Sequence, residues 1–358
     1  MMMRSSGSVP AAVGRDLWRS WFGGVVAVMG LVACGGSPPP PPETALVADP
    51  PSGDAAGTPG EGLADLDRGI AYVEKEAWED AKEHLERAVA ARPEDGDARY
   101  YLAVAHLNLG DAVAAEAGFK AAIERDTGLY LARAQLGGLY AGSDPPRARE
   151  AIEVLEPALA AIPDGPDEKS LRADVAQVLG FAHRVEKNYA ASQQHYEASL
   201  RAEDNPQVRF AMADMLLEAG RKDEARAALE RYVATVQDDP KILVAVARML
   251  ARAGGAEPCV TALDRALTLA PKVKTLFIDR GRCHLQAGDA KAAREDFNRA
   301  LKLDDRFQDA YFFLGLSWLE SNNRPRAVEA FQQVVRLDKT SKVGQAAQKR
   351  LDGLAGRP

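Results

Sequence analysis

An all-α fold of stacked helical hairpins is predicted by a pattern of small and bulky residues that repeats along the chain. Its best-formed copy covers residues 311–334. The first helix of this copy has one packing face at spacing i, i+3, i+4 and i+7, formed by Tyr311, Leu314, Gly315 and Trp318. A polar turn at 322–325 interrupts the pattern, as a turn leading into a new helix would. The second helix has an inner face at i, i+4 and i+7, formed by Ala327, Phe331 and Val334.

The same pattern recurs upstream at nearly constant spacing. From Gly315, the small residue of the first helix steps back by 34, 34, 34, 33, 43, 34 and 34 residues, to Gly281, Ala247, Ala213, Gly180, Gly137, Ala103 and Gly69. The small residue of the second helix is compact in every copy: Ala327, Ala293, Cys259, Ala225, Ser192, Ala151, Ala115 and Ala81. A bulky residue follows four places later: Phe331, Phe297, Leu263, Leu229, Tyr196, Leu155, Phe119 and Leu85. The small residues let two helices approach closely, and the bulky residues fill the space that remains.

This pattern resembles the tetratricopeptide repeat, a helix–turn–helix unit of 34 residues. The resemblance implies an all-α, right-handed superhelix, or α-solenoid, of about eight repeats with a concave and a convex side. We therefore assign 62–163 to units 1–3, 164–172 to an insertion or extended helix, 173–341 to units 4–8, and 342–358 to a capping helix and tail.

The step of 43 residues marks an irregularity between units 3 and 4. Two of the nine added residues lengthen the turn at 142–146, and the other seven fall within 164–172. Seven residues are close to two helical turns, so a longer first helix would keep its buried face. We expect 142–172 to change the curvature of the superhelix and to separate three units from five. A tolerated insertion without a role is the alternative.

Composition fits this fold and disfavours one class of function. The chain is 46% hydrophobic but only 6% aromatic, as suits an alanine-rich helical array whose core is spread along its length. Its net charge is −7, which disfavours general nucleic-acid binding.

The N-terminus reads as a targeting segment over residues 1–33. Basic Arg4, Arg15 and Arg19 precede an apolar run at 21–33 that is short for a membrane span. The run ends in Leu31-Val32-Ala33-Cys34, which resembles the lipobox of bacterial lipoproteins. That resemblance implies cleavage before Cys34 and attachment of acyl chains such as palmitate to its sulfur and amine. A plain secretory signal with an incidental cysteine is the alternative.

Residues 34–61 follow as the lipidated cysteine and a tether rich in Pro and Gly, whose composition lacks the apolar content to fold. Gly35 stands where an aspartate typically retains such lipoproteins at the inner membrane. The resemblance therefore implies the outer membrane, with the protein facing the periplasm or the cell surface. Several acyl chains would give stable anchoring.

The sequence contains no pattern that indicates catalysis, a metal site, a cofactor or a small-molecule substrate. The five histidines are interpreted as packing residues, since none form a pair with metal-ligand spacing on one helix. Buried free thiols are expected at Cys259 and Cys283, with a disulfide between adjacent helices as the alternative. Motifs for phosphate binding, a nucleophile elbow, a zinc protease and a calcium loop are all missing from the sequence. We therefore expect no enzymatic activity.

The resemblance also implies that a peptide would lie along the groove of first helices. Near the N-terminal end, residues beside the small slots form an apolar strip, comprising Leu66, Ile70, Val73, Tyr100, Val104 and Leu107. In units 6 and 7 the corresponding residues are basic, namely Arg248, Arg252 and Arg282, and acidic Asp214 and Glu218 precede them. This predicts a partner with an apolar and an acidic segment. Alternatively, the tether or cap shields the strip, and the arginines are ordinary solvated charges.

Taken together, these features predict a membrane-anchored scaffold that binds a protein of the bacterial envelope. It resembles repeat lipoproteins that help to assemble or localise outer-membrane complexes, such as secretin pilotins. A regulatory adaptor for a peptidoglycan hydrolase or protease is the first alternative. An enzyme in its own right is the second, and it would require a deep polar pocket.

Overall fold

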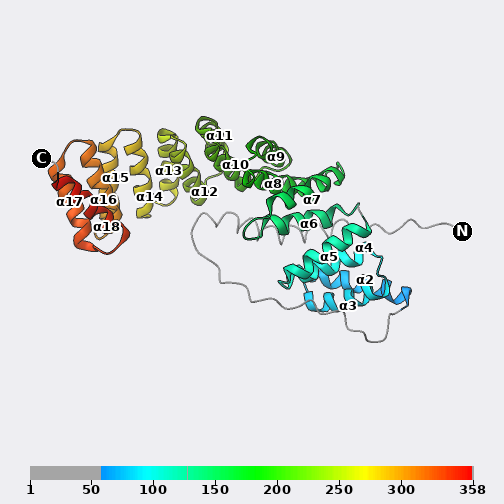
Figure 1. The fold of residues 1–358 in the computed structure, drawn as a ribbon. Helices are drawn as coiled ribbons and strands as arrows, with labels where there is room; N and C mark the ends of the chain where they lie inside the picture. The colour runs from blue at the N-terminus through cyan, green and yellow to red at the C-terminus, as the bar shows by residue number, and fades with distance from the viewer. Residues whose placement is uncertain (1–57, 127, 357–358) are drawn as a thin grey trace. The chain divides into compact units, whose positions relative to one another are not determined.

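The computed structural model describes residues 58–126 and 128–356, and these residues form helices connected by turns (Figure 1). The leader 1–33, Cys34 and most of the tether lie outside the described residues. In chain order the helices are α2 (Pro59–Val73), α3 (Trp78–Ala91), α4 (Gly96–Asn108), α5 (Ala112–Arg125), α6 (Tyr130–Ala141), α7 (Ala148–Ala161), α8 (Lys169–Val185), α9 (Tyr189–Ala202), α10 (Pro206–Glu218), α11 (Lys222–Thr235), α12 (Pro240–Arg252), α13 (Ala256–Leu269), α14 (Lys274–Gln286), α15 (Ala290–Leu303), α16 (Gln308–Glu320), α17 (Arg324–Leu337) and α18 (Lys342–Ala355).

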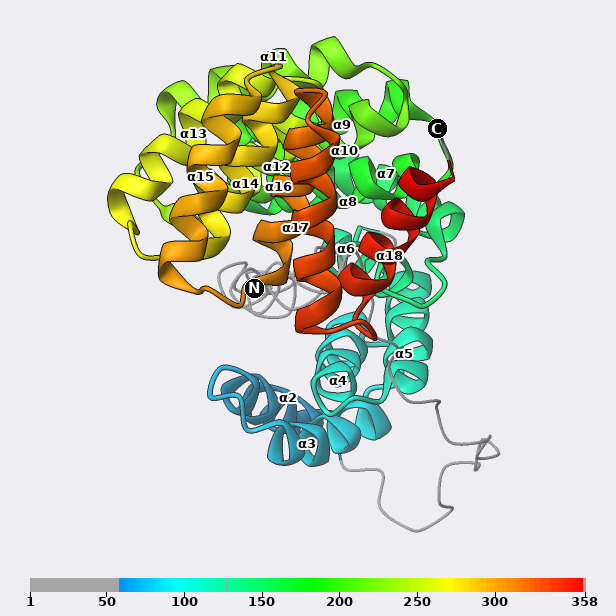
Figure 2. The ribbon, with the colours of Figure 1, turned by 90° about the vertical axis from the view of Figure 1, so that its left-hand side faces the viewer.

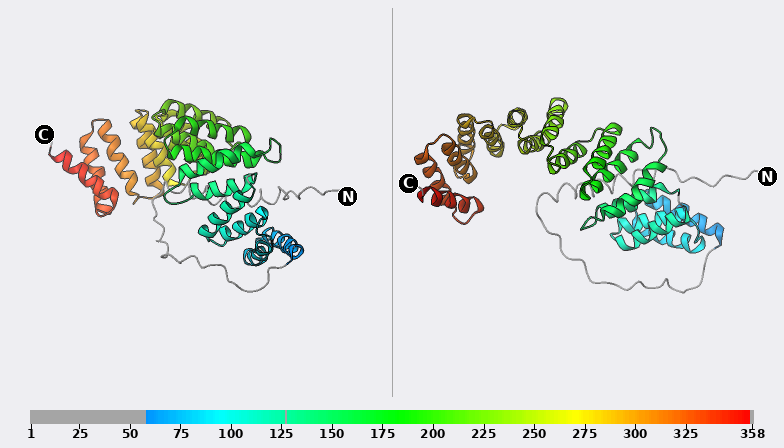
Figure 3. Two further views of the ribbon diagram at one scale, coloured as in Figure 1. Left: turned by 45° about the vertical axis from the view of Figure 1, so that its right-hand side comes forward. Right: turned by 45° about the horizontal axis from the view of Figure 1, so that its top comes forward.

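Pairs of consecutive helices form the eight hairpins that the sequence predicts. The even-numbered helices α2 to α16 are the first helices of the repeats, and the odd-numbered helices α3 to α17 are the second helices. The chain divides into two compact units, one up to Val208 and one from Arg209 onward. Unit 1 contains repeats 1–4, and unit 2 contains repeats 5–8 and α18. Within each unit, successive hairpins follow one another in Figure 3.

The positions of the small residues in the first helices, which we call the small slots, are as tightly packed as the sequence predicts. A Cβ added at Gly281 would lie 2.4 Å from Cε1 of Phe297, and one added at Gly137 would lie 2.3 Å from Cγ of Leu155. Both neighbours are the bulky residues of the second helix and are fully buried. Real side chains do not approach this closely, so glycine is required at these two helix contacts.

The turn inside seven of the eight described hairpins uses a left-handed backbone residue, and the turn between α6 and α7 is the exception. Gly288 adopts φ +82° between α14 and α15, and Asp289 then caps α15 by accepting a hydrogen bond from the backbone N–H of Ala292 at 2.9 Å. This conformation costs glycine nothing, and the aspartate satisfies a donor at the helix start. In the last repeat Asn322 takes the same conformation with φ +54°, which asparagine tolerates better than most residues.

The first helix of the fourth repeat is about one turn longer than that of the fifth, and residues 164–168 precede it outside the helix. Helix α8 has 17 residues, compared with 13 for α10, and its added turn places Leu171 in the core. The division between compact units nevertheless falls inside α10, after Val208, and not at residues 142–172. At the other end, α2 begins at Pro59, inside the segment assigned to the tether.

Helix α18 closes the C-terminal end of unit 2 against α16 and α17, as predicted for a cap (Figure 2). Ala347 is fully buried, and Val343, Leu351 and Leu354 pack partly buried against a cluster that contains Phe331. Its opposite face is polar. Among the described residues, the structure has no helix long and apolar enough to cross a membrane.

Candidate partner-binding face

The apolar strip expected near the start of the array belongs to the hydrophobic core. Five of its six side chains are buried, namely Leu66, Val73, Tyr100, Val104 and Leu107, and the sixth, Ile70, packs half-buried against them. The strip belongs to one hydrophobic cluster that extends from Leu66 to Ala182, so its side chains fill the space between the stacked helices of unit 1. The prediction that these residues face an open groove is therefore wrong.

The three arginines predicted for the groove are exposed on neighbouring first helices of unit 2. Arg248 and Arg252 lie on α12, and Arg282 lies on α14. Their side chains are 63%, 57% and 57% exposed, respectively. The structure thus places the predicted basic residues together on the surface and the predicted apolar residues in the core.

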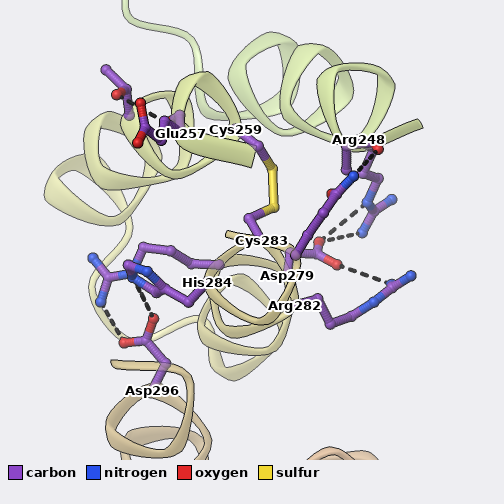
Figure 4. Close-up of a disulfide and its surroundings, with 12 residues drawn as sticks. Arg248, Glu257, Cys259, Asp279, Arg282, Cys283, His284 and Asp296 are labelled. Atoms are coloured by element: carbon purple, nitrogen blue, oxygen red, sulfur yellow. Dashed lines mark hydrogen bonds and ion pairs between the residues drawn. A yellow bond between two sulfur atoms is a disulfide. The ribbon is translucent and has the colours of Figure 1, made fainter. Parts of the chain in front are cut away.

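A carboxylate that the sequence analysis missed organises two of these arginines. Arg248 donates from Nε and Nη2 to Oδ2 of Asp279, at 3.1 and 2.9 Å. Arg282 lies one helical turn from Asp279 on α14, with Nη1 3.8 Å from Oδ1. The side chain of Asp279 is only 11% exposed, and it lies between the two arginines (Figure 4). The i, i+3 spacing of Asp279 and Arg282 is the sequence signal that could have revealed it.

Arg252 has its own partner, since its Nη1 donates to Oδ1 of Asp214 on α10 at 2.6 Å. The acidic residue that the sequence placed before the arginines is therefore part of the same face. Among the described residues, Nη1 of Arg248 and Nη2 of Arg252 have no partner. Three guanidinium groups share two carboxylates, which leaves donors and one net positive charge available to a ligand.

An aromatic ring and a second link between the helices flank the arginines. The guanidinium of Arg282 lies 5.3 Å from the centroid of the Phe313 ring on α16, within cation–π range. Gln286 donates from Nε2 to the backbone oxygen of Ala251 at 2.9 Å, which connects α14 to α12. These contacts connect the first helices of repeats 6, 7 and 8.

Cys259 and Cys283 are joined by a disulfide, with Cα atoms 6.1 Å apart, so the expectation of free thiols is wrong (Figure 4). The bond connects α13 to α14, the helix that carries Asp279 and Arg282. Both cysteines are buried. The sequence placed them on adjacent helices but could not show whether their sulfur atoms would meet.

The histidines lie in packing positions. His183 and His195 stack with ring centroids 5.2 Å apart, and burial lowers the pKa of both imidazoles. His84 stacks on Tyr72 and bonds to Asp65, with 2.8 Å between Nδ1 and Oδ1. Within residues 58–126 and 128–356, no group of three His, Cys, Asp or Glu residues could hold a metal ion.

These observations define an all-α repeat protein with a charged face on its first helices. Family models of the tetratricopeptide repeat match residues 66–129, 186–249, 260–306 and 278–342, which together exceed half of the chain. The chain belongs to the tetratricopeptide repeat family, whose fold supports a role as a scaffold for protein–protein interaction.

Comparison with solved structures and curated proteins adds little beyond the fold. PilF of Pseudomonas aeruginosa is 22% identical, with a TM-score of 0.45, and the match covers 64% of this chain and 98% of that one. A tetratricopeptide repeat protein from Parabacteroides merdae is 13% identical, with a TM-score of 0.39 and coverage of 83% and 100%. MamA from Desulfovibrio magneticus is 13% identical, with a TM-score of 0.38 and coverage of 48% and 97%. No curated protein matches the chain. These likenesses have no bearing on what the chain binds.

Proposed function

We propose that this protein is a lipid-anchored scaffold of the bacterial cell envelope, and that the arginine face of unit 2 binds an acidic segment of a partner protein. We define the arginine face as Arg248, Arg252 and Arg282 with Asp214 and Asp279. The observation that carries the proposal is the convergence of Arg248 and Arg282 on one largely covered carboxylate, Asp279.

This convergence prepares the arginines for a ligand. Asp279 neutralises only one of the two charges and occupies only some of their donors, so each guanidinium is oriented while it still has N–H groups to offer. Arginine donors bind carboxylates in a fork geometry, and such charge-assisted bonds are stronger than neutral ones. Because these arginine side chains are already oriented, they would lose less conformational entropy when a partner binds.

Attachment to the envelope rests on the leader and the lipobox at Cys34. An acylated Cys34 would hold the repeats near the outer membrane by a Pro-rich tether and leave the arginine face free to meet a partner. A scaffold of this kind would help to assemble or localise an outer-membrane complex. The face has donors for recognition but no metal-ligating cluster among the described residues.

Crosslinking from intact envelopes tests the partner site. Arg248→Glu combined with Arg282→Glu is expected to remove the crosslinked partner that the native protein captures, because two attractive charges become repulsive. Arg231→Glu is the control for a charge reversal elsewhere on unit 2, since Arg231 is exposed on the second helix α11 and, within the described part of the chain, its side chain bonds only to the backbone oxygen of Ala227. Capture of the same partner by all variants would refute the site. A hydrolase or protease as the partner would instead support the adaptor alternative.

Metabolic labelling with a clickable fatty acid tests the anchor separately. The native chain is expected to incorporate the label and to fractionate with membranes, whereas Cys34→Ser should lose the label. Equal labelling of both chains would show that Cys34 is not the acylated residue.

A further inference from the structure

A second surface of unit 2 lies at the turns that connect one repeat to the next. The exposed large apolar side chains among the described residues of unit 2 are Leu269, Val273 and Leu303, at 44%, 42% and 45% exposure. All three lie at or beside the turns that connect one repeat to the next. Leu269 ends α13, Val273 precedes α14, and Leu303 ends α15.

Basic residues surround these apolar side chains. We define the basic edge of unit 2 as residues 269–274, 301–307 and 335–342, the last three turns between helical hairpins. Its seven basic residues are Lys272, Lys274, Lys302, Arg306, Arg336, Lys339 and Lys342, against three acidic residues, Asp304, Asp305 and Asp338. The edge therefore has a net charge of +4 in a chain whose net charge is −7.

The corresponding turns of the earlier repeats have the opposite character. Residues 91–96, 125–130, 161–168 and 202–205 contain two basic residues and eight acidic ones. The turn at 235–240, the first in unit 2, contains Asp238 and Asp239 and no basic residue. Positive charge and exposed apolar side chains thus begin together at residue 269 and mark out one edge.

Direct contacts hold the three turns side by side. Lys274 bonds to Asp304 across the first two turns. Gln308, which begins α16, donates to the backbone oxygens of Val334 and Asp338 at 2.9 and 2.8 Å and joins the second turn to the third. Helix α16, which follows the second turn, packs against both α15 and α17.

The first two turns enclose an open hollow of about 610 Å³. It is lined by Lys272, Lys274, Lys302, Asp304, Asp305, Leu301 and Leu303, so three ammonium groups outnumber two carboxylates around an exposed leucine on one concave surface. A hollow of this size can accept a phosphate-bearing headgroup, while the neighbouring leucine and valine can reach the acyl boundary beyond it.

We propose that the basic edge is a docking surface for an anionic phospholipid bilayer. Lysines near a membrane surface are attracted by anionic headgroups, and exposed aliphatic side chains gain by leaving water at the interface. The long aliphatic stems of lysine also let the charged group reach the headgroups while the stem lies against apolar atoms. This inference does not depend on the arginine face or on acylation of Cys34, because it uses neither.

Site-specific fluorescence tests it in the full chain bearing Cys34→Ser, which removes the acylation site and leaves the disulfide intact. Leu303→Cys is labelled with an environment-sensitive fluorophore and mixed with vesicles of phosphatidylcholine with or without phosphatidylglycerol. The emission should shift to the blue only with phosphatidylglycerol, and salt should weaken the shift. Val113→Cys is the control site, because Val113 is 78% exposed but lies on α5 in unit 1. It reports any binding through the leader, and its emission should stay unchanged.

Charge reversal supplies the second readout. Lys272→Glu with Lys302→Glu should weaken vesicle binding at position 303 by more than about tenfold. Lys291→Glu with Lys349→Glu makes the same change in charge at exposed positions of α15 and α18 away from the edge, and should leave binding within about twofold. Equal shifts with both vesicle types, or equal effects of the two double substitutions, would overturn the proposal. A shift with poly-L-glutamate but none with the anionic vesicles would also overturn it and identify the edge as a protein-binding surface.

Discussion

Arg248 on α12 and Asp279 on α14 are linked by two hydrogen bonds to one carboxylate oxygen, at 3.1 and 2.9 Å, although they lie 31 residues apart in the sequence. The pair spans two consecutive repeats. It therefore connects two neighbouring repeats and also orients an exposed arginine. A change at Asp279 should affect both the packing of the repeats and the orientation of Arg248.

The coupling between Arg248 and Asp279 can be measured with a double-mutant cycle. We expect Arg248→Ala, Asp279→Ala and the double variant to give an interaction free energy of about 0.5–1 kcal/mol in urea unfolding, because the arginine is exposed and the pair is screened by solvent. Additive effects of the two single substitutions would show that the pair does not contribute to the stability of this face.

The small slots give a prediction about stability. Gly281→Ala should lower the free energy of unfolding by about 1–3 kcal/mol, because the added methyl group would overlap the buried ring of Phe297. Gly353→Ala is the matched control on α18, where a Cβ meets nothing within 4 Å. This second change should leave stability equal or raise it by up to about 1 kcal/mol through helix propensity. Similar losses from both substitutions would contradict the close helix contact at Gly281.

The helical hairpins and their small slots could be predicted from the sequence, because a glycine or alanine every 34 residues reports a contact that each repeat makes in the same way. Surface exposure could not. Val104 and Arg248 each follow a small slot by one residue, yet Val104 is buried and Arg248 is exposed. The difference depends on how closely neighbouring repeats pack and on whether the side chain can reach water. Asp279 was missed for a related reason, because its role depends on an arginine from the preceding repeat.

The disulfide between Cys259 and Cys283 closes a loop with a sequence separation of 24 residues. Its reduction should lower the free energy of unfolding by about 3 kcal/mol, since the reduced unfolded chain has more freedom. Unfolding in urea with and without dithiothreitol measures this difference. Cys259→Ala with Cys283→Ala should be insensitive to dithiothreitol. If dithiothreitol does not change the stability of the native protein, then the bond does not stabilise unit 2.

Asp97 in the first turn of α4 gives a pH-dependent prediction. Burial, reinforced by Asp95 and Asp126, raises the pKa of its carboxyl group to about 6. The folded state thus binds the proton more tightly than the unfolded state, and this contribution to stability is lost as pH rises through about 6.

Asp97→Asn should therefore stabilise the protein by about 1 kcal/mol at neutral pH, a value reduced to allow for the partial exposure of the side chain, and should have little effect near pH 4. Asp80→Asn provides the comparison, because Asp80 is an exposed aspartate in the first turn of α3. Thermal unfolding across this pH range checks both. A gain that does not grow with pH would contradict the raised pKa.

The central claim is that the first helices of unit 2 bind a partner through the arginine face, and site-specific photocrosslinking in living cells tests it most directly. A photoreactive amino acid replaces Gln286 on α14, next to the arginines, or Gln332, which is exposed on the second helix α17. We predict one discrete adduct from position 286, none from position 332, and loss of the adduct when Arg248→Glu and Arg282→Glu are added. An adduct at 286 that survives both charge reversals, or equal adducts at the two positions, would contradict the account.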